Sequence, residues 1–176
     1  MTEALTARDD GRTGTTMEII ADWLGAVVHR LGTGDVAELR RLDPLHPSAA
    51  VFWRLVAAMP DVGGDTPGQA ERERRFAVVL RTFAELRDVH RGGRRLGTAL
   101  AEAGFDERRL LQLLRSRRTA LAHTIRTTCH FLASKGAPAD AMGLARLVLS
   151  EDAPWEEDER RKLARDYFRA AARAER

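Results

Sequence analysis

The stretch from Arg94 to Gly136, RRLGTALAEAGFDERRLLQLLRSRRTALAHTIRTTCHFLASKG, holds the longest regular pattern in the chain. Its apolar residues recur every three to four positions, which is the period of an amphipathic α-helix. Asp106 is predicted to cap one helix of this stretch, and Gly104 to end the helix before it. Another helix is predicted from Arg118 to Lys135, so the stretch favours a helical fold.

The segment Glu107–Arg115 divides into two arcs on a helical wheel of about 100° per residue. Its apolar arc holds Leu110, Leu111, Leu113 and Leu114, and its polar arc holds Arg108, Arg109, Gln112 and Arg115. The two arcs do not overlap. We therefore expect the leucines to face the core and the guanidinium groups to face outward.

Helices are also predicted on both sides of this stretch, because no segment alternates apolar and polar residues as a β-strand does. Periodic apolar residues place them at Met17–Leu31, Val36–Leu42, Ser48–Met59, Ala70–Val89, Ala137–Ser150 and from Pro154 onward. Asp35 is predicted to cap the second of these helices, and Pro154 to begin the last one.

Two of these flanking helices carry specific expectations about burial. In the helix Ala70–Val89, the aromatic and aliphatic residues are expected to face the core. Its arginines are expected on the flanks and the solvent side; they are Arg72, Arg74, Arg75, Arg81 and Arg87. The buried stripe of the last helix is predicted as Leu163, Ala164, Tyr167, Phe168 and Ala171.

The sequence thus predicts an all-α protein of about eight or nine helices in two small helical bundles. Residues 1–16 are polar and small, and they are predicted to form a disordered leader. Residues 17–90 are assigned to an N-terminal bundle, and residues 91–176 to a C-terminal bundle with an Arg-rich face. The boundary is placed at His90–Arg95, HRGGRR, where two glycines interrupt the helix.

The positive charge is concentrated in the C-terminal half. The net charge of the 176 residues is only +3, and Lys135 and Lys162 are the only lysines among 29 basic residues. Between Arg91 and Arg126, however, nine arginines face three acidic residues. Two interpretations remain: a solvated charged face, or a surface that binds phosphate groups, for which the planar fork of arginine is well suited.

Few other functions are indicated by the sequence. A single cysteine, Cys129, excludes an internal disulfide and a multi-cysteine zinc site, and it fits a reducing cytoplasm. No run of about 18 apolar residues predicts a membrane span, and the N-terminus lacks the apolar core of a signal peptide. We therefore expect a cytoplasmic protein without membrane attachment.

No constellation of residues predicts catalysis, a metal or a cofactor. His123 and His130 share the polar face of their helix but lie about 10.5 Å apart along its axis, too far to ligate one metal by themselves. They are predicted to be exposed, and Cys129 to be buried. The pairs Gly63-Gly64 and Gly92-Gly93 lack the surrounding pattern of a nucleotide site. Only Phe105 is aromatic among the clustered arginines, so base stacking is not indicated.

Several segments resemble the CasB-type small subunit of the type I-E CRISPR Cascade complex. The run Leu96–Ala101, LGTALA, is similar to the family's "LGRAL" signature, and Gly104, Glu107-Arg108-Arg109, Gln112–Arg115 and Arg118 follow in the family's order. The flanking segments are Ala50–Val56, similar to "AFYRLV", Leu144–Leu147, similar to "LARLL", and Ala164–Phe168, similar to "ARDYY". One departure follows Asp140, where many members carry a tryptophan and this chain has Ala141-Met142.

The resemblance implies a subunit without enzymatic activity or cofactors that acts in antiviral defence. In the family, two copies line the inside of a complex that contains guide RNA, backbone subunits and a large subunit. They help to hold the R-loop by binding the DNA backbone, notably that of the displaced strand beside the target strand. The residues that match the family at such positions are Arg54, Arg109, Arg115, Arg118 and Arg126. Local charge adds Arg94, Arg95 and Arg108.

Two alternatives stay open on the residues alone. Leu100–Leu114 also has the pattern of a helix-turn-helix regulator, in which Arg108 and Arg109 would enter a major groove. Such a regulator would be a dimer with a palindromic site. The arginines would equally suit a helical adaptor that binds an acidic protein partner.

Overall fold

The computed structural model describes residue 23, residue 27, residues 30–58 and residues 68–174. Within these ranges the fold is all-α, as predicted. They contain no β-strand, and one isolated β-bridge joins His90 and Ala139. The helices are α2 (Thr33–Arg40), α3 (Ala50–Ala58), α4 (Gln69–Leu86), α5 (Leu96–Glu102), α6 (Glu107–Arg115), α7 (Arg118–Ser134), α8 (Met142–Leu149) and α9 (Glu156–Ala174). The predicted leader and most of the helix predicted at Met17–Leu31 lie outside the described residues.

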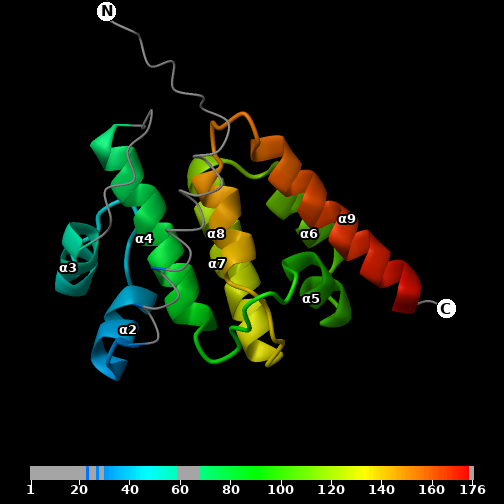
Figure 1. Ribbon diagram of the computed structural model, residues 1–176, viewed down its shortest axis with the longest axis horizontal. Helices are drawn as coiled ribbons and strands as arrows, with labels where there is room; N and C mark the ends of the chain where they lie inside the picture. The colour runs from blue at the N-terminus through cyan, green and yellow to red at the C-terminus, as the bar shows by residue number, and fades with distance from the viewer. Residues whose placement is uncertain (1–22, 24–26, 28–29, 59–67, 175–176) are drawn as a thin grey trace, which may run out of the picture.

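Helices α4, α7 and α8 pack against one another in the middle of the molecule (Figure 1). Helices α2 and α3 lie against α4 on one side, while α5 and α6 lie with α9 on the other. The buried apolar residues form one cluster that includes members of all these helices. Helix α4 therefore contacts both groups of helices that the sequence predicts as bundles, and the boundary at His90–Arg95 stays a prediction.

The ends of α5 and α6 follow the predicted cap chemistry. Gly104 adopts a left-handed backbone with a φ of 76°, and the amides of Gly104 and Phe105 donate to the carbonyls of Ala101 and Leu100. These two bonds close a Schellman turn at the C-terminus of α5. The Asp106 side chain then accepts hydrogen bonds from the amides of Arg108 and Arg109. Asp106 is thus the N-cap of α6, as predicted.

Some predicted boundaries are wrong by a few residues. Helix α2 begins at Thr33 after Gly32, so Asp35 lies inside its first turn rather than at the cap. An acidic residue is favourable there because it faces the positive end of the helix dipole. Helix α9 begins at Glu156, and Pro154 belongs to the preceding turn.

The expectation that the α4 arginines face solvent is wrong for Arg74, Arg75 and Arg81, which are all buried. The side chains of Arg74 and Arg75 are only 10% and 7% exposed, because carboxylates from the loop between α8 and α9 reach them. The expectation for Phe168 is also wrong, since it is exposed while Leu163 and Tyr167 of the same helix are buried.

Candidate nucleic-acid interface

The outer surface of α6 carries three arginines whose guanidinium groups make no ion pair or hydrogen bond with the described part of the chain. They are Arg108, Arg109 and Arg115, and all three are exposed, as the helical wheel predicts. We call them the α6 basic face. Leu110 and Leu113 of the same helix are fully buried, so the helix separates a core side from a cationic side. The α6 basic face is therefore free to bind anions from solution.

Helix α6 is held in place at both ends. Asp106 caps its N-terminus, and Arg160 of α9 reaches its C-terminus from below the surface. The Arg160 side chain is 3% exposed, and its Nη1 donates to the carbonyl oxygens of Leu113 and Leu114 at 3.5 and 2.8 Å. A buried arginine thereby satisfies carbonyls that a helix C-terminus leaves without partners. The orientation of the α6 basic face follows from this anchoring.

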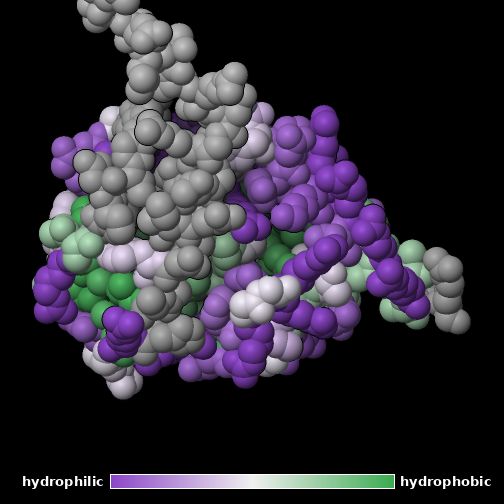
Figure 2. Space-filling model, in the orientation of Figure 1, coloured by the Kyte–Doolittle hydropathy of each residue, from purple (hydrophilic) through white to green (hydrophobic). Residues whose placement is uncertain are grey.

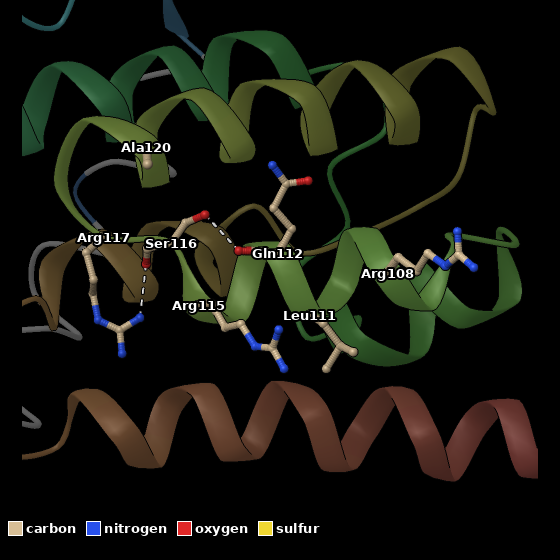
Figure 3. A pocket seen from close by; sticks show the side chains of 7 residues that line it. All are labelled: Arg108, Leu111, Gln112, Arg115, Ser116, Arg117 and Ala120. Atoms are coloured by element: carbon tan, nitrogen blue, oxygen red, sulfur yellow. Dashed lines mark hydrogen bonds between the residues drawn. The ribbon is translucent and has the colours of Figure 1, made fainter.

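A surface groove of about 550 Å³ runs along α6 to the start of α7 (Figure 3). Its lining consists of Arg108, Leu111, Gln112, Arg115, Ser116, Arg117 and Ala120. Leu111 and Arg115 point to the same side of α6, and the Ser116 hydroxyl donates to the Gln112 carbonyl at 2.7 Å. The groove therefore offers guanidinium groups beside an apolar side chain, an arrangement that suits an anionic polymer with apolar parts.

The other predicted arginines differ because each is paired with a carboxylate. Arg54 pairs with Asp35 at 2.9 Å, Arg94 with Glu102, Arg95 with Asp166 at 3.1 Å, Arg118 with Asp152 at 2.9 Å, and Arg126 with Glu85 at 3.7 Å. Most of these side chains remain at least half exposed, and exposed ion pairs contribute only about 0–1 kcal/mol. A phosphate group can therefore compete for them.

The predicted arginines do not form one continuous site. Arg108 and Arg115 lie together along the groove, whereas Arg54 sits on α3, on the far side of α4 from α6 (Figure 1). Arg94 and Arg95 precede α5 in a segment fixed by Asp140, whose carboxylate accepts from the Gly93 amide. In the view of Figure 2, hydrophilic residues cover the surface over α9.

An ionic cluster links the first turns of α4, α7 and α9 with the loop between α8 and α9. Its carboxylates are Glu71, Glu151, Asp152 and Glu156, and its cations are Arg74, Arg75, Arg117, Arg118 and Arg160. Hydrogen bonds from Arg74 and Arg75 lower the pKa of Glu71 to about 2. Arg117 contributes both to this cluster and to the groove, so the cluster fixes one end of the groove.

Sequence reasoning missed Arg117 and the apolar part of the groove. Arg117 lies between the helices predicted at Glu107–Arg115 and Arg118–Lys135, where no periodic pattern assigns its side chain a direction. Sequence reasoning also missed Glu85 of α4, whose carboxylate is 7% exposed and lies near Arg126. Only the packing of α4 on α7 brings those two residues together.

The histidine and cysteine predictions on α7 are confirmed. His123 and His130 are exposed, and Cys129 is fully buried. Burial raises the pKa of the Cys129 thiol well above its ordinary value, which keeps it protonated. No group of three or more histidine, cysteine or acidic side chains within the described ranges is placed to hold a metal. Among the described helices, none is both long and apolar enough to span a membrane.

Comparisons with known proteins identify related chains. The model of a family described as CRISPR-associated protein Cse2 matches residues 35–168. A chain in the crystal structure of E. coli Cascade bound to a PAM-containing dsDNA target is similar, with a TM-score of 0.62 and 26% sequence identity. The similarity covers 89% of this chain and 96% of that chain. No curated protein sequence matches.

Proposed function

This chain belongs to the family of CRISPR-associated protein Cse2, and on that premise we propose that it is the small subunit of a type I-E Cascade complex. In this role it binds the backbone of nucleic acid and stabilises the R-loop, and it contributes no catalytic step. The resemblance of the sequence segments, the family match and the similarity to a chain of DNA-bound E. coli Cascade support this proposal.

The observation that carries the nucleic-acid role is the α6 basic face. Three guanidinium groups on one helix lack carboxylate partners in the described structure, although five other predicted arginines have them. Unpaired arginines on an anchored helix can contact phosphates without first breaking an ion pair, and contacts to phosphates carry no base-sequence information. This suits a complex in which guide RNA supplies sequence recognition by base pairing.

The expected partners follow from this role. We propose two copies of the chain in a complex with guide RNA, backbone subunits and a large subunit, acting in the cytoplasm on the target and displaced DNA strands. Co-expression with the other type I-E subunits and guide RNA tests assembly. Absence of the chain from the purified ribonucleoprotein would contradict it.

The R-loop role has its own test, in the assembled complex. Arg109→Ala together with Arg115→Ala is expected to shorten the lifetime of the R-loop, because two phosphate contacts are lost while no ion pair of the fold is broken. Arg165→Ala with Arg169→Ala on α9 is the matched control, since both residues are exposed and the charge change is equal. An unchanged R-loop in the α6 variant would count against the proposal.

The helix-turn-helix alternative retains one supporting observation. Helices α5 and α6 are joined by the turn at Gly104, and α6 exposes Arg108, Arg109 and Gln112 as a recognition helix would. A regulator would bind one palindromic site far more tightly than random DNA, whereas the Cascade role predicts equal binding. Competition with random-sequence DNA separates the two.

A further inference from the structure

A cleft of about 270 Å³ lies between α8, α9 and the segment that leads into α5, and we call it the α8–α9 cleft. Helices α8 and α9 stand side by side in Figure 1. Glu159, Lys162 and Asp166 line the cleft from α9, and their spacing of three and four residues places them on one face of that helix. Arg146 lines it from α8. The cleft shares no lining residue with the groove along α6, so it is a separate surface.

The walls of the cleft are held by close packing and by backbone hydrogen bonds. Gly143 of α8 lies against Leu96 of α5, and a Cβ atom on Gly143 would lie only 2.6 Å from the Leu96 Cβ. The Asp140 carboxylate accepts hydrogen bonds from the amides of Gly93 and Met142 at 2.9 and 3.0 Å. These bonds tie the segment before α5 to the start of α8. The cleft is therefore preformed in the fold.

The charges that line the cleft are balanced. Three cationic and three acidic side chains line it, whereas three arginines and no acidic residue line the groove along α6. A phosphate backbone in the cleft would meet as many carboxylates as cations, and like charges repel. The cleft therefore does not suit a polyanion, although the groove does.

Half of the charged side chains in the cleft already have partners within the chain. Arg95 pairs with Asp166 at 3.1 Å, and Asp140 accepts its two backbone hydrogen bonds. The other three make no ion pair or side-chain hydrogen bond with the described residues, and they are Arg146, Glu159 and Lys162. Two cations and one carboxylate thus converge on the cleft and remain available to a ligand that carries charges of both signs.

We propose that the α8–α9 cleft is a docking site for a segment of another protein that carries a carboxylate and a basic group close together. The carboxylate of this segment pairs with Arg146 and Lys162, and its basic group pairs with Glu159. Complementary charges of both signs fix the register of a protein contact and disfavour wrong partners. Small-molecule pockets usually measure about 300–1,000 Å³, so the size of the cleft also favours the insertion of single side chains.

The inference rests on the proposed function, because a complex of several subunits supplies the partner. It assigns the segment to a subunit of a different kind from this chain. It also adds a protein contact on a surface that the α6 basic face does not include. The two surfaces allow the chain to hold a neighbouring protein and a nucleic-acid backbone at the same time.

The test adds the labelled full chain to a ribonucleoprotein assembled from guide RNA and the other subunits, without target DNA, and measures the dissociation constant. Arg146→Gln together with Lys162→Gln is expected to raise this constant about tenfold, which corresponds to the loss of two exposed ion pairs. Arg165→Gln with Arg169→Gln on α9 is the matched control, because both residues are exposed outside the cleft and the charge change is equal. The control is expected to bind as the wild type does.

Glu159→Gln distinguishes a protein ligand from nucleic acid, with Asp158→Asn at the exposed neighbouring position as its control. For a protein segment, the loss of the carboxylate weakens binding to the ribonucleoprotein about fivefold and leaves the affinity of the free chain for a single-stranded DNA oligonucleotide unchanged. For a nucleic-acid backbone, the loss of a negative charge tightens binding of the oligonucleotide beyond the effect of Asp158→Asn. That second result would overturn the inference.

An unchanged dissociation constant for the Arg146 and Lys162 double variant would overturn the inference and leave the proposed function standing, because the chain still joins the complex. A wild-type chain that does not join the complex would overturn both. Altered self-association of the free double variant, measured by sedimentation velocity, would assign the cleft to a second copy of the chain and overturn the assignment to a different subunit. Should circular dichroism show that the double variant does not fold, Glu159→Gln decides the question.

Discussion

Arg118 and Asp152 both adopt left-handed backbone conformations, and their side chains bond to each other. Their φ angles are 54° and 66°, and they are the only non-glycine residues with positive φ in the described ranges. Arg118 Nη2 donates to Asp152 Oδ1 at 2.9 Å, and Arg75 Nη2 donates to Asp152 Oδ2 at 2.6 Å. A left-handed backbone costs roughly 1–2 kcal/mol per residue. The bonds of the ionic cluster therefore offset the backbone strain where the loop before α9 meets the start of α7.

Two replacements of Asp152 distinguish how much its charge and its left-handed backbone conformation each contribute to the free energy of unfolding. Asp152→Ala is expected to lower the free energy of unfolding by about 2 kcal/mol, because Arg75 loses a buried partner and the backbone strain remains. Asp152→Asn is expected to cost less, since asparagine tolerates a left-handed backbone and its amide oxygen still accepts a hydrogen bond. Urea denaturation measures both, and equal losses would contradict this role of Asp152.

Acid is expected to weaken the fold through Glu71. Hydrogen bonds from Arg74, then Arg75, lower its pKa from 4.5 to about 2. A lowered folded-state pKa means that the stabilisation is complete above about pH 4.5 and disappears as the pH falls through about 2. Stability should therefore decline over that range when followed by urea denaturation at each pH.

Glu71→Gln is expected to flatten this decline and to cost about 2 kcal/mol at pH 7, because the negative charge is removed and the amide nitrogen cannot accept a hydrogen bond from an arginine as the second carboxylate oxygen does. Glu73→Gln on the same helix is the control, since Glu73 accepts only an exposed bond from Gln69. The same acid decline in both variants would show that Glu71 is not its source.

Gly97 permits the close approach of α5 to α9. A Cβ atom there would lie 2.5 Å from the Leu163 carbonyl oxygen and 2.7 Å from the Tyr167 amide nitrogen. Gly97→Ala must therefore push two helices apart, at an expected cost of about 1–3 kcal/mol. Gly92→Ala, where a Cβ would meet no atom within 4 Å, is expected to leave the melting temperature nearly unchanged. Equal melting temperatures for the two variants would refute this packing.

The sequence pattern was sufficient for the helical fold and for the α6 basic face, because both depend on local periodicity. Glu107–Arg115 is a helix with the predicted bounds, and Leu110 and Leu113 are buried as predicted. Leu111 and Leu114 were also expected in the core, but they are only partly buried, and Leu111 lines the groove. Asp106 also caps it as predicted. These features follow from residues no more than one or two turns apart.

The buried arginines were not predictable in the same way. Arg74 and Arg75 bond to Glu151 and Asp152, which lie 76 or 77 residues later in the chain. A helical wheel assigns such arginines to solvent because it contains no distant carboxylate. The spacing of Glu71 to Arg74 and Arg75, three and four residues, was the one local signal of an ionic cluster.

Binding of the nucleic-acid backbone by the α6 basic face can be measured through the salt dependence of DNA binding. The measurement compares two triple variants. The α6 variant carries Arg108→Gln, Arg109→Gln and Arg115→Gln. The matched α9 variant carries Arg165→Gln, Arg169→Gln and Arg173→Gln, which remove the same charge. For a single-stranded oligonucleotide, we expect the α6 variant to bind more weakly, with a slope of log K against log salt that is shallower by about 2, while the α9 variant retains the wild-type slope. Equal slopes for both variants would contradict binding by the α6 basic face.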